Sequence, residues 1–411
     1  MTEIPEPSDA QWAAIRACGE FLGGRDQIFR LFGAAGVGKT TIIQRIMQEY
    51  PDSGPYYPIA LSGKAVDVMR SKGLPQAQTI HSLLYQPAVP SAATIESLFA
   101  DLENAKSKSR QAEIRRELTR LTDLKWNYSQ FYQEALEKGV SGTIILEEAS
   151  MVGQSTVEDL LGLGLQIIAV GDPFQLPPVQ DKAFLTTTKP DVFLTEVHRQ
   201  ALESGVYRLA TQIRNREPIA ARKEADCLVV NSPAMNTGPL LSKFTQVLCG
   251  KHATRLRLNA QIREALNYHD CTPQVGERLI CTKNKAVAST GGAEAVEVFN
   301  GQNLIVEEAH GTYSNAAVDL SLRKAANDET LRQEVYDGEF LDHYDFDPDR
   351  RFRDHRRKQE LFQADYGYAI TCHKAQGSEY PHVYIVDDAF GNSVEERIRW
   401  LYTAVTRAQE S

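Results

Sequence analysis

The chain has 411 residues, which at roughly one domain per 150 residues allows two to four domains. Hydrophobic residues make up 42% and charged residues 24%, which is ordinary globular usage and excludes a wholly disordered or fibrous chain. The 45 Lys+Arg against 54 Asp+Glu give a net charge of −9, which argues against a polycationic nucleic-acid coat. A local basic groove remains compatible with this sum, because binding depends on where the charge lies.

The cysteines and the apolar segments indicate a cytoplasm-like compartment and no membrane role. Six cysteines are scattered without a C-x-x-C pair, so we expect reduced and mostly buried thiols. The first ten residues carry three acids and two prolines and cannot form a signal peptide. The most apolar run, residues 160–170, is interrupted by Gln166 and two glycines and is too short to span a bilayer.

From Ile28 onward the sequence has the pattern that opens a βα unit. An apolar strand at residues 28–32 leads into a glycine turn at 33–38 and then into a helix that begins at Lys39. Further short apolar strands fall into two series. The first series is at residues 57–61, 143–146 and 166–170, and the second is at residues 246–249, 278–281 and 382–386. We therefore predict an α/β protein with two halves, each built on a parallel sheet.

Two segments interrupt these halves. Residues 91–138 are charged, and their apolar residues recur at three- and four-residue steps, which predicts two amphipathic helices. Residues 303–363 start strand-like and end in a basic run from Arg350 to Lys358, which is more often a solvated face than a DNA tract. The predicted boundaries are 1–90 and 139–198 for the first half, and 199–302 and 364–411 for the second.

The glycine turn matches the pattern G-x-x-x-x-G-K-[ST] between a predicted strand and a predicted helix. Its residues are Gly33, Ala34, Ala35, Gly36, Val37, Gly38, Lys39 and Thr40. The glycines let backbone N–H groups turn toward phosphate at the positive end of the helix. Lys39 would reach the β- and γ-phosphates, Thr40 would place its hydroxyl on Mg²⁺, and Thr41 completes the nucleotide-binding set. The alternative is a turn that only joins the strand to the helix. Such a turn would not require all the fixed residues of the eight-residue pattern, so the full match favours phosphate binding.

Two acids at the end of the predicted strand 143–146 supply the partner that such a loop needs. Glu147 would hold Mg²⁺ through water, and Glu148 would polarise the attacking water. Acids at a strand end are also common as solvated caps, but their combination with the loop favours the functional reading. Both motifs together predict a nucleoside triphosphatase without fixing its class, since kinases, switch GTPases, transporters and motors share them.

Seven further blocks, in order, resemble the motifs of a superfamily 1 helicase of the 1B branch, which includes RecD-like and Dda-like enzymes. These blocks are residues 8–11, 61–65, 79–82, 171–178, 194–200, 371–377 and 401–408. The resemblance covers nearly the whole chain. It implies that Gln11 reads adenine, that Gln175 couples hydrolysis to movement, and that Arg199 and Arg407 are arginine fingers.

The resemblance also implies contacts with single-stranded DNA and with the nucleotide. The DNA-binding candidates offer phosphate-directed donors or a flat stacking surface, and they are Ser62, Lys64, Thr79, His81, Phe174, His373 and Lys374. Gly377 is added to the nucleotide-binding set. Each of these residues alone could be a solvated polar side chain or, for Phe174, part of the core.

The fold implied is two RecA-like motor domains, with a helical insertion in the first and a small β-rich, SH3-like insertion in the second. The activity implied is an ATP- and Mg²⁺-dependent 5′-to-3′ translocase that unwinds DNA in replication, recombination or repair. The partners implied are single-stranded DNA, junctions, and single-strand-binding or replisome proteins, for a monomer in the cytoplasm of a prokaryotic or phage-infected cell. The alternatives are a small-molecule kinase and a nucleotide-dependent DNA-binding or loader protein.

Three features depart from the family pattern. Members usually carry Asp-Glu where this chain has Glu147-Glu148, and they usually continue into another strand where this sequence ends at Ser411. They often have a strand-splitting β-hairpin where helices are predicted at 91–138. The densest aromatic cluster of that segment is a candidate for the splitting surface or for the core: Trp126, Tyr128, Phe131 and Tyr132.

Overall fold

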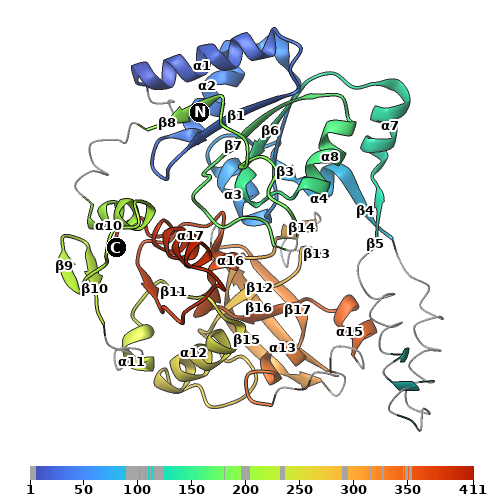
Figure 1. The fold of residues 1–411 in the computed structure, drawn as a ribbon. Coiled ribbons are helices and arrows are strands. Elements are labelled where there is room, and N and C mark those ends of the chain that lie inside the picture. Colours follow the sequence, from blue (N-terminus) through green and yellow to red (C-terminus); the bar gives the residue numbers. More distant parts are fainter. Residues whose placement is uncertain are drawn as a thin grey trace. The chain divides into compact units, whose positions relative to one another are not determined.

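The computed structural model places the chain in two compact units (Figure 1). Unit 1 is formed by residues 1–83, 131–268 and 368–411, and unit 2 by residues 84–130 and 269–367. The structure describes residues 6–88, 101, 107, 110–111, 113–114, 125–179, 181–195, 204–231, 237–288, 295–313, 316–325, 328–345, 347, 350 and 354–411. None of the helices in this described part combines the length and the apolar character that a membrane crossing requires.

The first half of unit 1 is built on a six-stranded sheet with the order β3-β2-β6-β7-β1-β8. Its elements are α1 (Asp9–Leu22), β1 (Ile28–Gly33), α2 (Lys39–Glu49), η1 (Pro51–Ser53), β2 (Tyr56–Ala60), α3 (Gly63–Ser71), β3 (Gln78–Thr79), α4 (Ile80–Leu84), α7 (Gln130–Lys138), β6 (Thr143–Glu147), η2 (Ala149–Met151), α8 (Gln154–Gly162), β7 (Gln166–Gly171) and β8 (Val192–Leu194). All neighbouring strands are parallel. The strands predicted at 57–61, 143–146 and 166–170 are thus confirmed as members of a parallel sheet.

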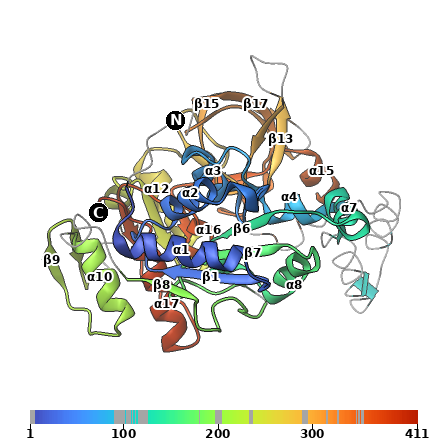
Figure 2. The ribbon, with the colours of Figure 1, turned by 90° about the horizontal axis from the view of Figure 1, so that it is seen from above.

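Helices cover both faces of this sheet (Figure 2). The connections β1-α2-β2 and β2-α3-β3 run in one direction across the sheet, whereas β6-α8-β7 runs in the other. Because such crossovers are right-handed, α2 and α3 lie on one face and α8 lies on the opposite face. Apolar residues of α1, α2 and α3 form one core with β1. The carboxyl ends of β1, β2, β6 and β7 therefore meet at one open edge, where ligands bind in sheets of this kind.

The second half of unit 1 has a small parallel sheet with the order β19-β11-β20. Its elements are α10 (Gly205–Arg214), β9 (Arg222–Glu224), β10 (Cys227–Val229), α11 (Gly238–Leu241), β11 (Gln246–Cys249), α12 (His252–Ala265), β19 (Ala369–Thr371), α16 (Cys372–Ala375), β20 (Val383–Ile385) and α17 (Val394–Val405). The buried amide of Asn259 on α12 donates to the carbonyl oxygen of Ala369 and accepts from its N–H, both at 2.9 Å. It thereby occupies the backbone groups of β19 that point away from β11.

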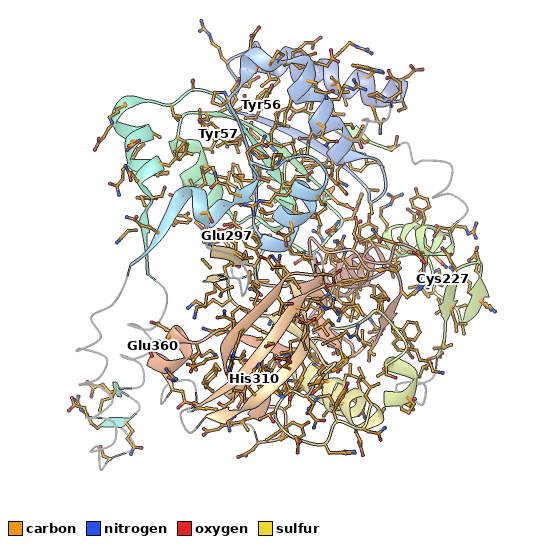
Figure 3. All side chains as sticks on the ribbon, turned by 180° about the vertical axis from the view of Figure 1, so that it is seen from behind. Tyr56, Tyr57, Cys227, Glu297, His310 and Glu360 are labelled. Carbon is orange, nitrogen blue, oxygen red and sulfur yellow. The ribbon has the colours of Figure 1, made fainter. Side chains whose placement is uncertain are left out.

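Unit 2 is antiparallel. Its main sheet has the order β17-β16-β15-β12-β18, and β13–β14 and β4–β5 form two separate two-stranded antiparallel sheets. The elements are β4 (Tyr85–Ala88), β5 (Lys125–Tyr128), β12 (Arg278–Cys281), β13 (Lys285–Ala288), β14 (Ala295–Val298), β15 (Asn303–Tyr313), β16 (Ala317–Lys324), β17 (Thr330–Tyr336), α13 (Gly338–Leu341), α15 (His355–Glu360) and β18 (Ala364–Tyr366). Glu297 on β14, His310 on β15 and Glu360 on α15 are labelled in Figure 3.

Two sequence-based assignments in this unit are wrong. The strand at 278–281 forms, but it pairs antiparallel with β15 and β18 instead of joining the second parallel sheet. The boundary at residue 303 therefore moves to about residue 269. A short buried apolar strand has the same sequence pattern in both kinds of sheet, so the pattern could not distinguish them.

The predicted helical insertion also needs correction. Residues 125–128 form strand β5, paired antiparallel with β4, so Trp126 and Tyr128 lie on a strand and not on a helix. The two helices predicted from the apolar residues at 95–102 and 114–124 fall mostly outside the described residues, and residues 130–138 at the end of the segment form α7. On α7, Tyr132 is buried, and the ring of Phe131 lies 5.4 Å from that of Tyr57 on β2, which is labelled in Figure 3.

The basic run that ends the second insertion is largely neutralised where it is described. Arg350 pairs with Asp342, Arg357 with Glu334, and Lys358 with Glu339. Arg351 and Arg353, and the side chain of Arg356, lie outside the described residues. These ion pairs indicate a solvated face of unit 2 rather than a free cationic tract.

Candidate nucleotide site

The loop between β1 and α2 has the backbone that phosphate binding requires. Gly36 and Gly38 have φ values of 81° and 78°, in the left-handed region that a Cβ disfavours. Helix α2 begins directly after Gly38, so its unpaired N–H groups and its positive end face the loop. The strand–loop–helix context predicted for residues 33–40 is present.

The Lys39 ammonium group closes back over this loop. Its Nζ atom donates hydrogen bonds to the carbonyl oxygens of Gly33 and Ala34, each at 2.9 Å. Carbonyl oxygens carry only partial negative charge, so a phosphate oxygen would compete well for the same ammonium group. The free structure thus holds the cation where a β- or γ-phosphate would meet it.

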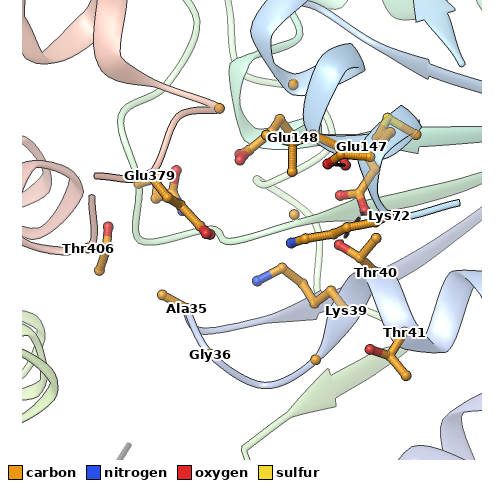
Figure 4. A pocket seen from close by; sticks show the side chains of 18 of the residues that line it. Ala35, Gly36, Lys39, Thr40, Thr41, Lys72, Glu147, Glu148, Glu379 and Thr406 are labelled. Atoms are coloured by element: carbon orange, nitrogen blue, oxygen red, sulfur yellow. Dashed lines mark hydrogen bonds between the residues drawn. The ribbon is translucent and has the colours of Figure 1, made fainter. Parts of the chain in front are cut away.

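A cavity of about 560 Å³ opens at this loop (Figure 4). It is lined by side chains and backbone from both halves of unit 1, among them Lys39, Thr40, Thr41, Gln44, Lys72, Glu147, Glu148, Gln175, Gly377, Glu379, Thr406 and Arg407. Figure 4 shows Lys39 and Lys72 extending beside one another, with Thr40 and Glu147 at one end and Glu379 and Thr406 at the other. The structure therefore brings together residues that lie almost 370 positions apart in the sequence.

Glu147 ends β6 and is only 8% exposed. Burial, together with the neighbouring Glu148, raises the pKa of Glu147 to about 7, against the opposing effects of Lys39, Lys72 and Thr40. The hydroxyl of Thr40 donates to its Oε1 atom at 3.3 Å. A buried carboxylate beside a hydroxyl offers the oxygen ligands that fit Mg²⁺.

Glu148 carries backbone strain. Its φ and ψ are 53° and 40°, a left-handed conformation that a non-glycine residue adopts only when its surroundings enforce it. This conformation turns the chain from β6 into η2 and leaves the carboxylate on the cavity wall. The group is thus placed to orient water beside a bound triphosphate.

Gln175 and Arg407 reach the cavity from opposite halves, and each is 4% exposed. The Oε1 atom of Gln175 has no hydrogen-bond partner within the described part of the chain. The guanidinium of Arg407 donates only to neutral acceptors there: the carbonyls of Thr403 and Ser378 and the hydroxyl of Thr406. A buried cation without a carboxylate partner and a buried unpaired acceptor both favour an anion and a water at this wall.

Thr403 on α17 links these two groups. Its hydroxyl accepts from the N–H of Leu176 at 2.9 Å, and its carbonyl accepts from the Arg407 guanidinium. One residue away, the Tyr402 hydroxyl donates to the buried carboxylate of Asp172 at 2.7 Å. The loop that carries Gln175 is thus fastened to the helix that ends beside Arg407.

Two parts of the chain match known protein families. Residues 6–228 match the family described as AAA domain, and residues 366–411 match the UvrD-like helicase C-terminal domain. The chain belongs to this AAA-domain family. Its place in the RecD-like branch of superfamily 1, which the motifs indicated, is confirmed.

A curated relative is the ATP-dependent RecD2 DNA helicase of Deinococcus radiodurans, which is 25% identical over 292 residues. The match covers 68% of this chain but only 37% of that relative. Among solved structures, a Bacteroides Pif1 helicase in complex with ADP-AlF3 and ssDNA is 17% identical, with a TM-score of 0.53 over 100% of this chain and 91% of that one. A Pif1 helicase from Candida albicans is 16% identical, with a TM-score of 0.50 over 98% and 92%. These structures confirm the α/β fold class with two RecA-like domains.

Two residues that the family resemblance assigned to the nucleotide, Gln11 and Arg199, are not among the described residues that line the phosphate cavity. Gln11 does not line the phosphate cavity: its amide accepts from the Ser8 N–H at 2.9 Å and donates to the Val37 carbonyl at 3.0 Å. It therefore anchors the phosphate loop in this AAA domain. Arg199, the first predicted arginine finger, lies outside the described residues.

The DNA-binding candidates fall into three groups. The hydroxyls of Ser62 and Thr79 cap the starts of α3 and α4, by accepting from the N–H groups of Ala65 and Ser82. Burial lowers the pKa of Lys64, His81 and His373, so each is partly removed from water. Lys374 is exposed.

Phe174, the candidate stacking surface, packs against other side chains of unit 1. Its ring meets Phe193 and Tyr402 edge-on at 6.1 Å, and the Arg214 guanidinium lies 5.3 Å from its centroid. It keeps 36% exposure, which leaves part of the ring free.

The sequence motifs did not identify three residues that line the cavity, namely Lys72, Glu379 and Thr406. They also did not identify Thr403, which links Leu176 to Arg407. Lys72 follows the end of α3, and nothing in its local pattern distinguishes it from a solvated lysine. Glu379, Thr403 and Thr406 lie within or directly beside blocks already assigned, so extending each block by two residues would have found Glu379.

The raised pKa of Glu147 predicts a pH-dependent stability. The folded state binds the proton more tightly than the unfolded state, whose pKa is near the ordinary 4.5, so this residue lowers the free energy of unfolding as pH rises from about 4.5 to about 7. In the absence of Mg²⁺, Glu147→Gln should raise the melting temperature by a few degrees at pH 8 and leave it unchanged near pH 4.5.

Differential scanning fluorimetry at both pH values measures this difference, with Glu137→Gln on the exposed side of α7 as the matched control. Equal melting temperatures for Glu147→Gln and the parent at pH 8 would contradict the assignment. Mg²⁺ with ADP should stabilise the parent more than the variant.

Proposed function

We propose that the chain is an ATP-dependent DNA helicase that moves 5′ to 3′ along single-stranded DNA and separates duplexes in replication, recombination or repair. The observation that carries the proposal is the shared cavity, in which Lys39 and Glu148 of one half face the same space as Arg407 of the other. A nucleotide held there is sensed by both halves, so its hydrolysis can change how they contact one another.

The chemistry at this cavity is assigned to named side chains. ATP as the substrate brings the phosphoanhydride bond, and Thr40 and Glu147 would hold a Mg²⁺ ion, which would supply positive charge against the phosphates. Lys39 binds the β- and γ-phosphate oxygens, and Glu148 orients the attacking water and accepts its proton. Arg407, with Arg199, stabilises the charge that develops on the transferred phosphoryl group. Gln175 contacts the water or the γ-phosphate through its unpaired oxygen.

DNA as the partner draws support from the motif blocks and from the relatives. Solved Pif1 helicases with this fold were determined with single-stranded DNA and with forked double-stranded DNA. The polarity rests on the resemblance to the 1B branch alone, because the motor motifs do not encode direction. A monomer, single-strand-binding or replisome partners, and a cytoplasmic location complete the proposal.

An unwinding assay with 5′-tailed and 3′-tailed duplexes side by side, with and without ATP, tests the proposal. We expect ATP-dependent separation of the 5′-tailed duplex. Glu148→Gln should retain ATP binding and lose turnover by about two orders of magnitude, since it removes the group that activates water.

Separation of the 3′-tailed duplex alone would reject the polarity. Binding of ATP and DNA without turnover or unwinding in the parent would favour the alternative, a nucleotide-dependent DNA-binding or loader protein.

The link through Thr403 predicts a coupling phenotype. Gln175→Ala and Thr403→Val should each reduce DNA-stimulated ATP hydrolysis and unwinding more than basal hydrolysis, because the loop of residues 172–176 loses its contact with the nucleotide or with α17. Steady-state ATPase rates with and without single-stranded DNA measure this ratio.

Thr187→Val is the matched control, since its hydroxyl bonds only within its own loop, to the Phe184 carbonyl. Equal loss of basal and stimulated rates in Thr403→Val would argue against a coupling role.

The antiparallel strand pair β4–β5 is the proposed strand-splitting element. Tyr128 on β5 is 43% exposed, and its ring stacks on that of Tyr85 at 6.1 Å, which offers an aromatic surface to the last base pair. Tyr128→Ala should impair unwinding while translocation and DNA-stimulated ATPase on single strands persist. The side chain of Trp126 lies outside the described residues.

Phe131→Ala serves as the comparison, because its ring packs against Tyr57 within unit 1 and its loss should lower stability and both activities together. If Tyr128→Ala behaves in the same way, the residue is structural and the splitting surface lies elsewhere.

A further inference from the structure

Lys72 brings a second ammonium group into the phosphate cavity. Figure 4 shows its side chain extending beside that of Lys39, and both side chains line the cavity. The charge of Lys72 also opposes the rise in the pKa of Glu147, so its ammonium group lies near that carboxyl group. In the sequence Lys72 falls between the blocks 61–65 and 79–82, so no motif assigns it a role.

The backbone holds Lys72 in a fixed position at the end of α3. Gly73 has a φ of 94°, in the left-handed region, and its N–H donates to the carbonyl oxygen of Arg70 at 3.1 Å. The N–H of Leu74 donates to the carbonyl oxygen of Met69 at 3.0 Å, and the side chains of these two residues are buried in one core. This is the hydrogen-bond pattern of a Schellman motif, in which Lys72 is the C-cap residue of the helix.

A side chain of the phosphate-loop helix also holds this position. Gln44 on α2 donates from its amide to the carbonyl oxygen of Lys72, and Gln44 itself lines the cavity. The Cα atom of Lys72 is therefore fixed both by the end of α3 and by α2. Only the side chain of Lys72 can adjust, and it reaches the cavity.

The ammonium group of Lys72 has no hydrogen bond or ion pair within the described part of the chain. Lys39, by contrast, is held by two carbonyl oxygens of the phosphate loop, and Arg407 is held by neutral acceptors. A diphosphate on the loop is already met by the N–H groups of the loop and by Lys39. Two further cations, Lys72 and Arg407, therefore match the additional charge of a third phosphate.

Helix α3 carries this cation at one end and DNA-binding candidates at the other. The hydroxyl of Ser62 caps the start of the helix, and Lys64 lies in its first turn. The helix has nine residues and is about 13 Å long. Because a helix is a rigid element, a change in the contacts at Lys72 can be passed to its first turn.

We infer that Lys72 binds the γ-phosphate of the nucleotide and thereby ties α3, with the DNA-binding candidates at its start, to the presence of that phosphate. When hydrolysis releases inorganic phosphate, Lys72 loses its partner and α3 loses this constraint. The inference rests on the proposed function and adds to it a residue that distinguishes a nucleoside triphosphate from a diphosphate.

The first test is calorimetric titration of the intact chain with ADP and with the non-hydrolysable triphosphate AMP-PNP, in the presence of Mg²⁺. Lys72→Ala should weaken AMP-PNP binding by about tenfold, the loss expected for one charge-assisted contact, and should leave ADP binding within about twofold of the parent. Lys72→Gln should behave as Lys72→Ala does. Lys72→Arg keeps the charge and should retain most of the AMP-PNP affinity.

Lys138→Ala is the matched control. Lys138 is also an exposed lysine at the end of a helix, α7, but it lies outside the phosphate cavity. Its removal takes the same charge from a helix end and should change neither affinity. Differential scanning fluorimetry should give the parent's melting temperature for both alanine variants, which separates a lost contact from a lost fold.

The second test measures how strongly the γ-phosphate and DNA depend on one another. Fluorescence anisotropy with a labelled oligothymidine strand gives the DNA affinity of the chain with ADP and with AMP-PNP. We expect the two affinities to differ in the parent and in Lys138→Ala, and to approach one another in Lys72→Ala. Because such coupling is reciprocal, DNA should change the parent's ratio of AMP-PNP to ADP affinity by the same factor.

Equal loss of ADP and AMP-PNP affinity in Lys72→Ala, or no loss of either, would overturn the γ-phosphate contact. A ratio of DNA affinities in Lys72→Ala equal to that of the parent would overturn the tie through α3. Failure of the parent to bind either nucleotide would reject the proposed function together with this inference. Nucleotide binding without DNA binding would reject the helicase proposal and the tie through α3, and the first test alone would still decide the γ-phosphate contact.

Discussion

The parallel register of the six-stranded sheet is the constraint on which the site depends. Pairing of Ala60 with Glu147, and of Phe32 with Gly171, sets the carboxyl ends of four strands at one edge. The phosphate loop, the two acids and the loop that carries Gln175 all begin at those ends. A slip of one residue in β6 would turn Glu147 to the other face of the sheet and separate it from Thr40.

Burial at this edge sets the electrostatic character of the site. Two adjacent glutamates and a buried arginine without a carboxylate partner would be costly in a protein that bound nothing. The nucleotide and metal proposed for this site would supply both charges: the cation for Glu147 and the anion for Arg407. Glu147 and Arg407 would therefore lower the stability of the fold when the site is empty and raise it when the ligand is bound. A binding site can retain such residues at a cost in the stability of the unbound protein.

The sequence was informative where chemistry requires a fixed spacing. The phosphate loop needs glycine at Gly36 and Gly38 and a lysine directly after, so its function could be read from eight letters. The strands β12 and β5 were misassigned because four-residue strands have no periodicity that identifies their partners. The contacts of Tyr402 with Asp172 and of Thr403 with Leu176 join segments about 230 residues apart, and only the folded chain reveals them. Gln11 shows a different limit, because its motif does not reveal the hydrogen bonds to Ser8 and Val37 that the folded chain makes.

The amide of Asn259 affects how readily the edge strand β19 can pair with a strand from another molecule. A three-stranded parallel sheet has two open margins, and each could template a strand from another molecule. Asn259 occupies both backbone groups of Ala369, the first residue of β19, on the side that faces away from β11. A strand added at this margin would have to displace the Asn259 amide before it could pair with Ala369.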